Sequence, residues 1–167
     1  MSLKDLMLQQ LAIARLITAD GHENVPAWRI ETPDDGAWLI LTRFDPDKPG
    51  HSDRVLYLVR RYMAWKFAQA FVMTAETWLG PTVTRQGEEA VTAVGVSRAE
   101  RLAVIQRIRR KGTAVEFGPL EWLAPEQMDP LYWTILPGRT ETVTAKEAAE
   151  LAAIFAESGE LPAQKIN

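Results

Sequence analysis

Two histidines stand close to carboxylates in the sequence and are the first candidates for acid–base chemistry. His22 lies between Asp20 and Glu23, and His51 lies two residues before Asp53. A neighbouring carboxylate can orient an imidazole as a general base. An exposed loop histidine is the simpler interpretation of each, because residues typical of loops surround both. Neither has a second histidine at the spacing of a metal motif, and we expect no metal or other cofactor.

A pocket between a sheet and its helices is the arrangement in which such residues would act together in a small-molecule-binding protein or enzyme. In that case we expect at least two of four side chains to converge in one concave site: His51, Asp53, Glu76 and Arg107. The serines lie outside any G-x-S-x-G sequence, and there is no cysteine and no glycine-rich phosphate loop. The paired acids of the Pro-Asp-Asp-Gly sequence at 33–36 are explained by a turn.

Arginines follow one side of the extended segment predicted at 101–110. Alternation places Arg101, Arg107 and Arg109 on one face and mostly aliphatic side chains on the other. Such a face can hold phosphates, and Trp78 could stack on a base. Glutamates at 76, 88, 89 and 116 could instead neutralise it across strands, and the net charge of -3 favours this interpretation. Nucleic-acid binding through residues 101–111 stays open as the weaker alternative.

Aromatic side chains are the other candidate binding feature. The chain has six tryptophans, and Trp122, Tyr132 and Trp133 fall in a proline-containing stretch at 119–138. Tryptophan and tyrosine are frequent at interfaces, where an apolar ring packs while its polar atom finds a hydrogen-bond partner. We interpret these three residues as a surface for a ligand, for a protein partner or for a second copy of the chain, which would form a homodimer.

The spacing of apolar residues predicts the elements that position these side chains. Helical spacing predicts a helix at 3–19, ended by Asp20-Gly21, and a second one at 53–69 with Ser52 or Asp53 as its N-cap. A Thr-x-x-Glu capping box starts a third helix at 145–157. Extended segments are predicted at 27–31 and 37–44, which form a hairpin, and at 70–79, 88–97, 101–110 and 113–118.

The last four extended segments are joined by short connections, so they must pair as an antiparallel β-meander. Residues 119–138 are expected to be irregular, with a short edge strand at 131–136 between two prolines, and residues 160–167 to be a loose tail. The predicted fold class is α+β: two layers, with a mostly antiparallel sheet of five to seven strands and the helices packed on one face.

We expect a single domain, 1–167. It divides into a helix with a hairpin (1–44), a loop (45–52), a helix with the meander (53–118), the aromatic stretch with the last helix (119–159), and the tail. A content of 47% hydrophobic and 25% charged residues is typical of a soluble globular protein. No apolar run is long enough to cross a membrane, and the acid and glutamines near Met1 do not fit a signal peptide. We therefore expect a cytoplasmic protein with no membrane contact.

The sequence AFVMTAETWL followed by EEAVTAVGVSRAERLAVIQRIRR resembles uncharacterised small bacterial, phage- or plasmid-encoded α+β proteins. The resemblance covers about residues 53–110 and departs at RAE (98–100), where an Asp-Gly turn would be typical. It implies an accessory protein of a mobile element, with no activity or site residues to carry over. The first functional expectation is accordingly a non-catalytic interaction protein that associates with itself. The pocket and the basic strand are the two alternatives.

Overall fold

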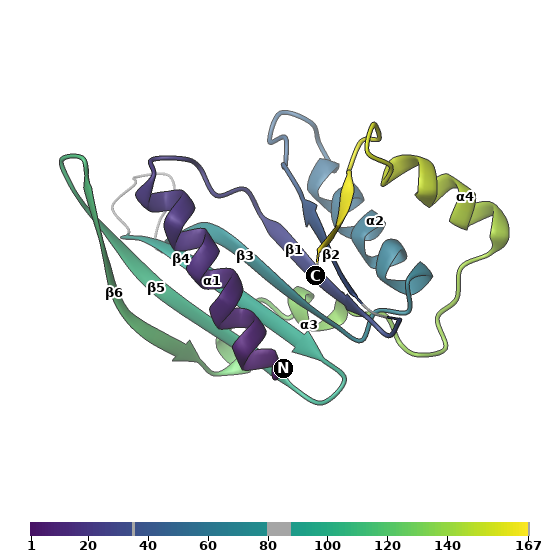
Figure 1. Cartoon of the computed structure of the whole chain (residues 1–167), viewed down its shortest axis with the longest axis horizontal. Coiled ribbons are helices and arrows are strands. Elements are labelled where there is room, and N and C mark those ends of the chain that lie inside the picture. Colours follow the sequence, from purple (N-terminus) through teal and green to yellow (C-terminus); the bar gives the residue numbers. More distant parts are fainter. Residues whose placement is uncertain (35, 80–87, 167) are drawn as a thin grey trace.

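An open, seven-stranded antiparallel sheet forms the frame of the protein (Figure 1). The computed structural model describes residues 1–34, 36–79 and 88–166. The strand order is β6-β5-β4-β3-β1-β2-β7. The strands are β1 (Ala27–Thr32), β2 (Gly36–Leu41), β3 (Ala70–Leu79), β4 (Glu88–Ser97), β5 (Arg101–Lys111), β6 (Ala114–Leu123) and β7 (Ala163–Ile166). The helices are α1 (Leu3–Ala19), α2 (His51–Trp65), α3 (Leu131–Thr134) and α4 (Ala145–Ile154), with a 3-10 turn η1 (Pro125–Gln127) before α3.

The predicted α+β class and the antiparallel meander are confirmed. β3 pairs with β4, β4 with β5 and β5 with β6, all antiparallel. The predicted hairpin is β1 and β2, and β1 also pairs with β3, which joins the hairpin to the meander in one sheet.

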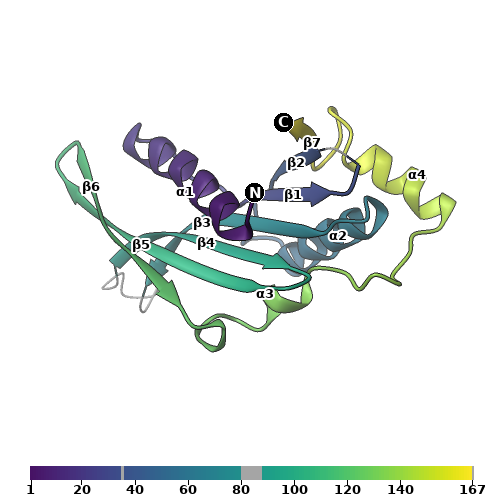
Figure 2. The same ribbon diagram turned by 60° about the horizontal axis from the view of Figure 1, so that its bottom comes forward.

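Helix α1 packs on β3 and β4, on one face of the sheet (Figure 2). Its buried side chains, among them Met7 and Leu11, meet a cluster that includes Val72 and Val104. The helix begins with a capping box, in which the Ser2 hydroxyl accepts from the Asp5 N–H and the Asp5 carboxylate accepts from the Ser2 N–H. The Ser2 hydroxyl also donates to Asp5 Oδ2 at 2.6 Å, and this hydrogen bond, together with that from the Ser2 N–H, lowers the pKa of Asp5. The first residues of the chain therefore position α1.

Helices α2 and α4 lie over the opposite face, so the predicted placement of all helices on one face is wrong. Tyr62 and Met63 of α2 and Phe155, which caps α4, share a buried cluster with Phe71 and Met73 of β3. Successive side chains of a strand point to opposite faces. Because the apolar run of β3 has no polar alternation, it buries both of its faces, one under α1 and the other under α2.

The predicted edge strand at 131–136 is wrong, because residues 131–134 form helix α3. The Trp133 N–H donates to the carbonyl oxygen of Pro130 at 3.0 Å. The fixed φ of proline suits the start of a helix as well as the end of a strand, so the flanking prolines did not distinguish the two. Strand β6 also continues through Pro119 to Leu123, further than predicted, since an edge strand tolerates a residue without an N–H.

The predicted loose tail is also wrong, because residues 163–166 form β7 on the outer edge of β2. The Leu161 N–H donates to Ile154 O at 2.9 Å and the Ala163 N–H to Phe155 O at 3.0 Å, which returns the chain from α4 to the sheet. A strand of four residues is too short to leave an alternating pattern in the sequence.

Helix α2 starts two residues earlier than predicted. Its N-cap is Gly50, with φ of 73° and no side-chain cap, and Ser52 and Asp53 lie inside the first turn. This start places His51 at the first helical position, where the loop that precedes α2 turns back over it.

Candidate functional site

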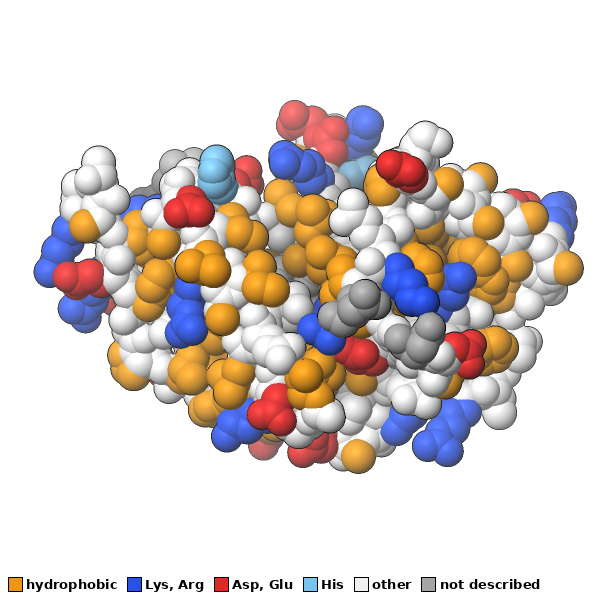
Figure 3. Space-filling view, in the orientation of Figure 1, with side chains coloured by type: hydrophobic (Ala, Val, Ile, Leu, Met, Phe, Trp, Pro, Cys, Tyr) orange, Lys and Arg blue, Asp and Glu red, His pale blue; other side chains and the backbone are white. Residues whose placement is uncertain are grey.

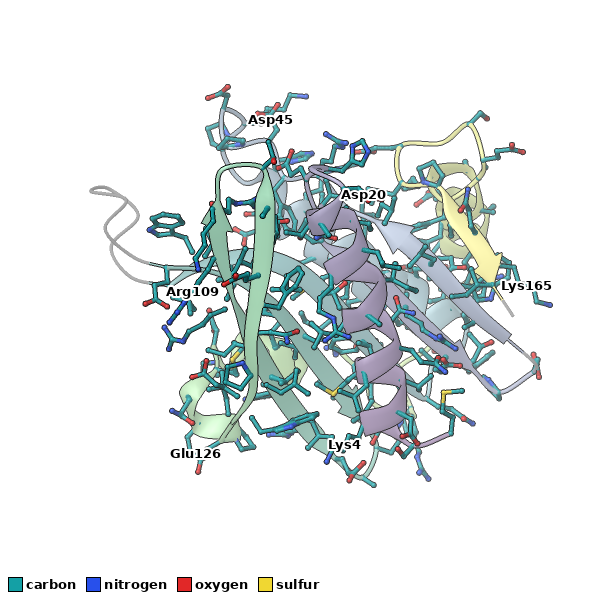
Figure 4. The ribbon with its side chains drawn as sticks, turned by 60° about the vertical axis from the view of Figure 1, so that its left-hand side comes forward. Lys4, Asp20, Asp45, Arg109, Glu126 and Lys165 are labelled. Atoms are coloured by element: carbon teal, nitrogen blue, oxygen red, sulfur yellow. The ribbon has the colours of Figure 1, made fainter. Side chains whose placement is uncertain are left out.

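A cleft of about 760 Å³ opens where the end of α1, the loop before α2 and the end of β3 meet. Its walls come from segments 23–26, 43–46 and 76–78, with Lys48, His51 and Glu89; we call it the His51 cleft. Figure 4 shows that the loop carrying Asp45 and the end of α1 at Asp20 lie at the same end of the molecule. Acidic, basic and histidine side chains gather along this edge in the space-filling view (Figure 3).

Glu76 supplies a carboxylate that the fold holds in place. Its Oε1 accepts from the Thr18 hydroxyl at 2.6 Å and from Asn24 Nδ2 at 3.2 Å. Asn24 also donates to the Ala14 carbonyl oxygen at 2.8 Å and to Thr18 Oγ1 at 2.6 Å, and both Thr18 and Asn24 are buried. Within the described chain the second oxygen, Oε2, has no hydrogen-bond partner. Glu76 therefore keeps one oxygen fixed and one oxygen available.

His51 is oriented by the loop in front of its own helix. Its Nδ1 accepts from the Asp45 N–H at 2.9 Å. Because that nitrogen is the acceptor, the neutral imidazole carries its proton on Nε2. The ring is half-buried and lines the cleft, so it offers a donor of fixed direction.

Trp78 lies two residues after Glu76 and so projects from the same face of β3 into the cleft lining. Its indole Nε1 is buried and has no hydrogen-bond partner among the residues that the structure describes. A buried donor without a partner costs about 1 to 3 kcal/mol.

Charged residues of both signs complete the cleft. Lys48 pairs with Asp45 at 3.8 Å, and Glu89 pairs with Arg110 at 2.7 Å. Arg43 and Glu23 also line the walls, and in the described ranges neither has an ion pair. The cleft thus offers a cation and two carboxylates beside an indole.

The structure brings together two of the four residues that the sequence suggested for a pocket. His51 and Glu76 line the same cleft, and Trp78 joins them. Asp53 is exposed on the first turn of α2 and does not line it. Arg107 lies on the face of β5 opposite to α1, outside the cleft. The convergence required for a pocket is therefore met by His51 and Glu76 and not by Asp53 or Arg107.

Of the three arginines on this face of β5, Arg107 is neutralised by glutamates, and within the described residues Arg101 and Arg109 have no ion pair. Arg107 pairs with Glu88 at 2.7 Å and with Glu121 at 2.8 Å, and these contacts raise the pKa of Arg107. Lys111 pairs with Glu116 at 3.4 Å. Arg109 is exposed on β5, next to the edge strand β6 (Figure 4). Nucleic-acid binding through residues 101–111 therefore stays a prediction.

The three residues interpreted as one aromatic surface lie on different faces of the sheet. Trp122 is on the α1 face, opposite Val104 in register, and Lys4 of α1 lies over its ring at 5.0 Å. Tyr132 and Trp133 are half-buried in α3 and pack against the cluster under α2. Burial raises the pKa of Tyr132. Self-association stays a prediction, but these residues do not form a single patch for it; light scattering would test it.

A second cavity, of about 930 Å³, lies at the end of α2. Phe67 and Arg98 line it together with residues from β1 and from the segment after α3. Phe67 is 66% exposed and has a positive φ of 53°. The guanidinium of Arg98 donates to backbone carbonyl oxygens of Ala68 and Pro137, so its main use is to hold the chain segments together.

No protein-family model, curated protein or solved structure matches the chain. The predicted resemblance to phage- or plasmid-encoded proteins therefore stays a prediction. No group of histidines and acids suited to a metal occurs in ranges 1–34, 36–79 and 88–166. Over the same ranges no helix is long and apolar enough to cross a membrane.

Sequence reasoning missed the residues that support the cleft. Thr18 and Asn24 fix Glu76, and Arg43 adds a cation to the wall. Thr18 lies on the buried, apolar side of α1 in its last turn. The spacing of apolar residues does not show which side chain Thr18 would bond there. A buried polar residue at the end of an amphipathic helix was the one signal that pointed to it.

Proposed function

We propose that the protein binds a small polar molecule in the His51 cleft. The observation that carries the proposal is the convergence of His51, Glu76 and Trp78, from the successive elements α2 and β3, on one cavity. Sites of this kind combine a concave shape with a few fixed polar groups and an aromatic wall. Here the fixed groups are an oriented imidazole and a carboxylate held by Thr18 and Asn24.

The free groups of the cleft define the chemistry of the ligand. Glu76 Oε2 and the Glu23 carboxylate accept hydrogen bonds and favour a basic nitrogen, whereas Arg43 favours a carboxylate or phosphate. Trp78 supplies a flat ring against which a planar group can stack. We infer a ligand that carries both an acidic and a basic group and is small enough for about 760 Å³, such as an amino-acid-like or heterocyclic metabolite.

A thermal-shift screen with amphoteric small molecules tests the proposal. A ligand present at about 100 times its Kd stabilises the folded state by about 2.7 kcal/mol, which for a chain of this size raises the Tm by about 5 to 10 °C. A ligand found in this way should lose at least about tenfold in affinity with Glu76→Gln, which keeps the shape of the side chain and removes its charge.

Asp53→Asn is the matched control, because Asp53 lies in the first turn of α2, two residues from His51, yet outside the cleft. Its affinity should equal that of the wild type. A screen in which no compound shifts the Tm, or a ligand that binds Glu76→Gln and the wild type equally, would refute the proposal.

A further inference from the structure

Three aromatic rings surround the amine of Lys66, at the end of α2 and away from the His51 cleft. The Nζ atom lies 3.9 Å from the centroid of Trp65, 5.2 Å from that of Trp38 and 5.9 Å from that of Tyr62. We call these three rings the aromatic box. Trp38 comes from β2 and the other two from α2, so the box joins the helix to the sheet.

The walls of the box stand nearly at right angles. Tyr62 and Trp65 have an interplanar angle of 86°, and Trp38 and Tyr62 one of 76°. Tyr62 is 1% exposed and is supported from behind by Phe155 at 4.5 Å, whereas Trp38 and Trp65 are only partly buried. The box therefore has a fixed back wall and two side walls that reach the surface.

The chemistry of the box fits its occupant poorly. A lysine ammonium has three N–H donors, and within the described residues Nζ of Lys66 has neither a hydrogen bond nor an ion pair. Burial lowers the pKa of Lys66, since ring faces replace water without supplying an acceptor. A cation without N–H donors leaves no donor unsatisfied in the same place, and the ring faces attract its charge through their quadrupoles.

We propose that the aromatic box is a binding site for a quaternary ammonium group, and that Lys66 fills the box until such a group displaces it. Lys66 follows the last residue of α2 and has a flexible four-carbon side chain, so it can leave the box without moving the helix. Outside the box, the displaced ammonium group can form hydrogen bonds with water, which the rings do not provide. The proposal does not depend on the His51 cleft, because no residue of the box lines that cleft.

Removing the occupant should strengthen binding. Lys66→Ala empties the box and takes away one positive charge, so tetramethylammonium and choline should bind this variant about tenfold or more tightly than the wild type. Lys4→Ala is the matched control: Lys4 also lies over an indole, that of Trp122 at 5.0 Å, but over a single ring. It should bind these cations no better than the wild type.

Two further measurements identify the interaction as one with the rings. Lys66→Ala combined with Trp65→Leu should lose the gain, with circular dichroism and Tm confirming that the double variant is folded. The uncharged isostere of choline, 3,3-dimethylbutan-1-ol, should bind Lys66→Ala at least about tenfold more weakly than choline does. In the wild type, the ring-shifted Lys66 CεH₂ NMR signals should move to ordinary positions as tetramethylammonium is added.

The proposal is overturned if Lys66→Ala binds these cations no better than the wild type and Lys4→Ala. It is also overturned if choline and its uncharged isostere bind equally, or if the Trp65→Leu combination keeps the full affinity. Should Lys66→Ala fail to fold, the wild-type NMR titration decides alone: Lys66 signals that do not move at saturating tetramethylammonium refute displacement.

Discussion

Gly95 in β4 is the point at which α1 comes closest to the sheet, and a substitution there tests the packing on that face. A Cβ atom at this position would lie 2.6 Å from Sδ and 2.9 Å from Cγ of Met7, and 3.1 Å from Cδ1 of Leu3. Met7 is completely buried, so its side chain has little space into which to move. Rotation at the end of the side chain can move Sδ, but Cγ is part of the stem and stays close.

The expected cost of Gly95→Ala follows from two opposing effects. Overpacking a close-packed core costs about 1 to 3 kcal/mol. Replacing glycine by alanine in a strand returns about 0.5 to 1 kcal/mol, because glycine loses more backbone entropy on folding. We therefore expect a net loss of about 1 to 2 kcal/mol, or a decrease in Tm of about 3 to 6 °C.

A double-mutant cycle with Met7→Ala shows whether the clash is the cause. Met7→Ala alone should cost about 2 to 5 kcal/mol, because it leaves a cavity under α1. In the double variant the new methyl group occupies part of that cavity, so the combined loss should be smaller than the sum by about 1 kcal/mol or more. Urea unfolding followed by circular dichroism gives the four free energies of unfolding.

Gly118→Ala in β6 is the matched control. Its Cβ would meet only Arg107, at 3.7 Å, an ordinary van der Waals distance. The free energy of unfolding should change by less than about 0.5 kcal/mol or increase. If Gly95→Ala were as stable as the wild type, or if its effect and that of Met7→Ala were additive, α1 would not pack on Gly95 as described.

Three further predictions concern the ends of α2 and α4. Phe67 has a positive φ of 53°, so Phe67→Gly should be about 1 kcal/mol more stable to urea than Phe67→Ala; equal stabilities would contradict strain there. Arg61 donates to Glu147 at 2.5 Å and 2.8 Å and lowers the pKa of that carboxyl below its ordinary 4.5. This stability is present above about pH 4.5 and is lost as pH falls through the lowered pKa, so the Tm advantage over Glu147→Gln should be present at pH 6 and shrink toward pH 3. A Tm difference independent of pH would argue against it. A Cβ at Gly159 would meet the backbone carbonyl oxygen of Ile154, so Gly159→Ala should cost about 2 to 3 kcal/mol and speed hydrogen exchange at β7; unchanged exchange would contradict it.

The meander was predictable from the sequence because each of its strands is long and bounded by polar residues. β3 and β4 begin and end as predicted, and β5 differs by one residue. α1 was predicted at 3–19 because its leucines keep helical spacing and Asp20-Gly21 marks its end. In the structure Gly21 has a positive φ of 80°. These elements are long enough for the periodic spacing of their apolar residues to be recognised in the sequence.

The placement of the helices was not predictable in the same way. In β3 residues 70–73 are all apolar, and in β4 residues 90–96 are apolar except for Thr92 and Gly95; such runs indicate burial on both faces rather than on one. The alternation in β5, with arginines on one face, suggested an exposed side for the whole sheet. That side is exposed only toward the β6 edge, where Arg107 pairs with Glu88 and Glu121.

Both candidate sites follow from this two-sided burial. A sheet covered on both faces has little flat surface left at its centre, so concave and aromatic surfaces form where the covering helices end. The His51 cleft lies beyond the end of α1, and the aromatic box lies at the end of α2. They join residues far apart in the sequence, such as Asn24 with Glu76 and Trp38 with Lys66. The spacing of residues in a sequence cannot show pairs of this kind, because only the pairing of the strands and the crossing of the helices brings them together.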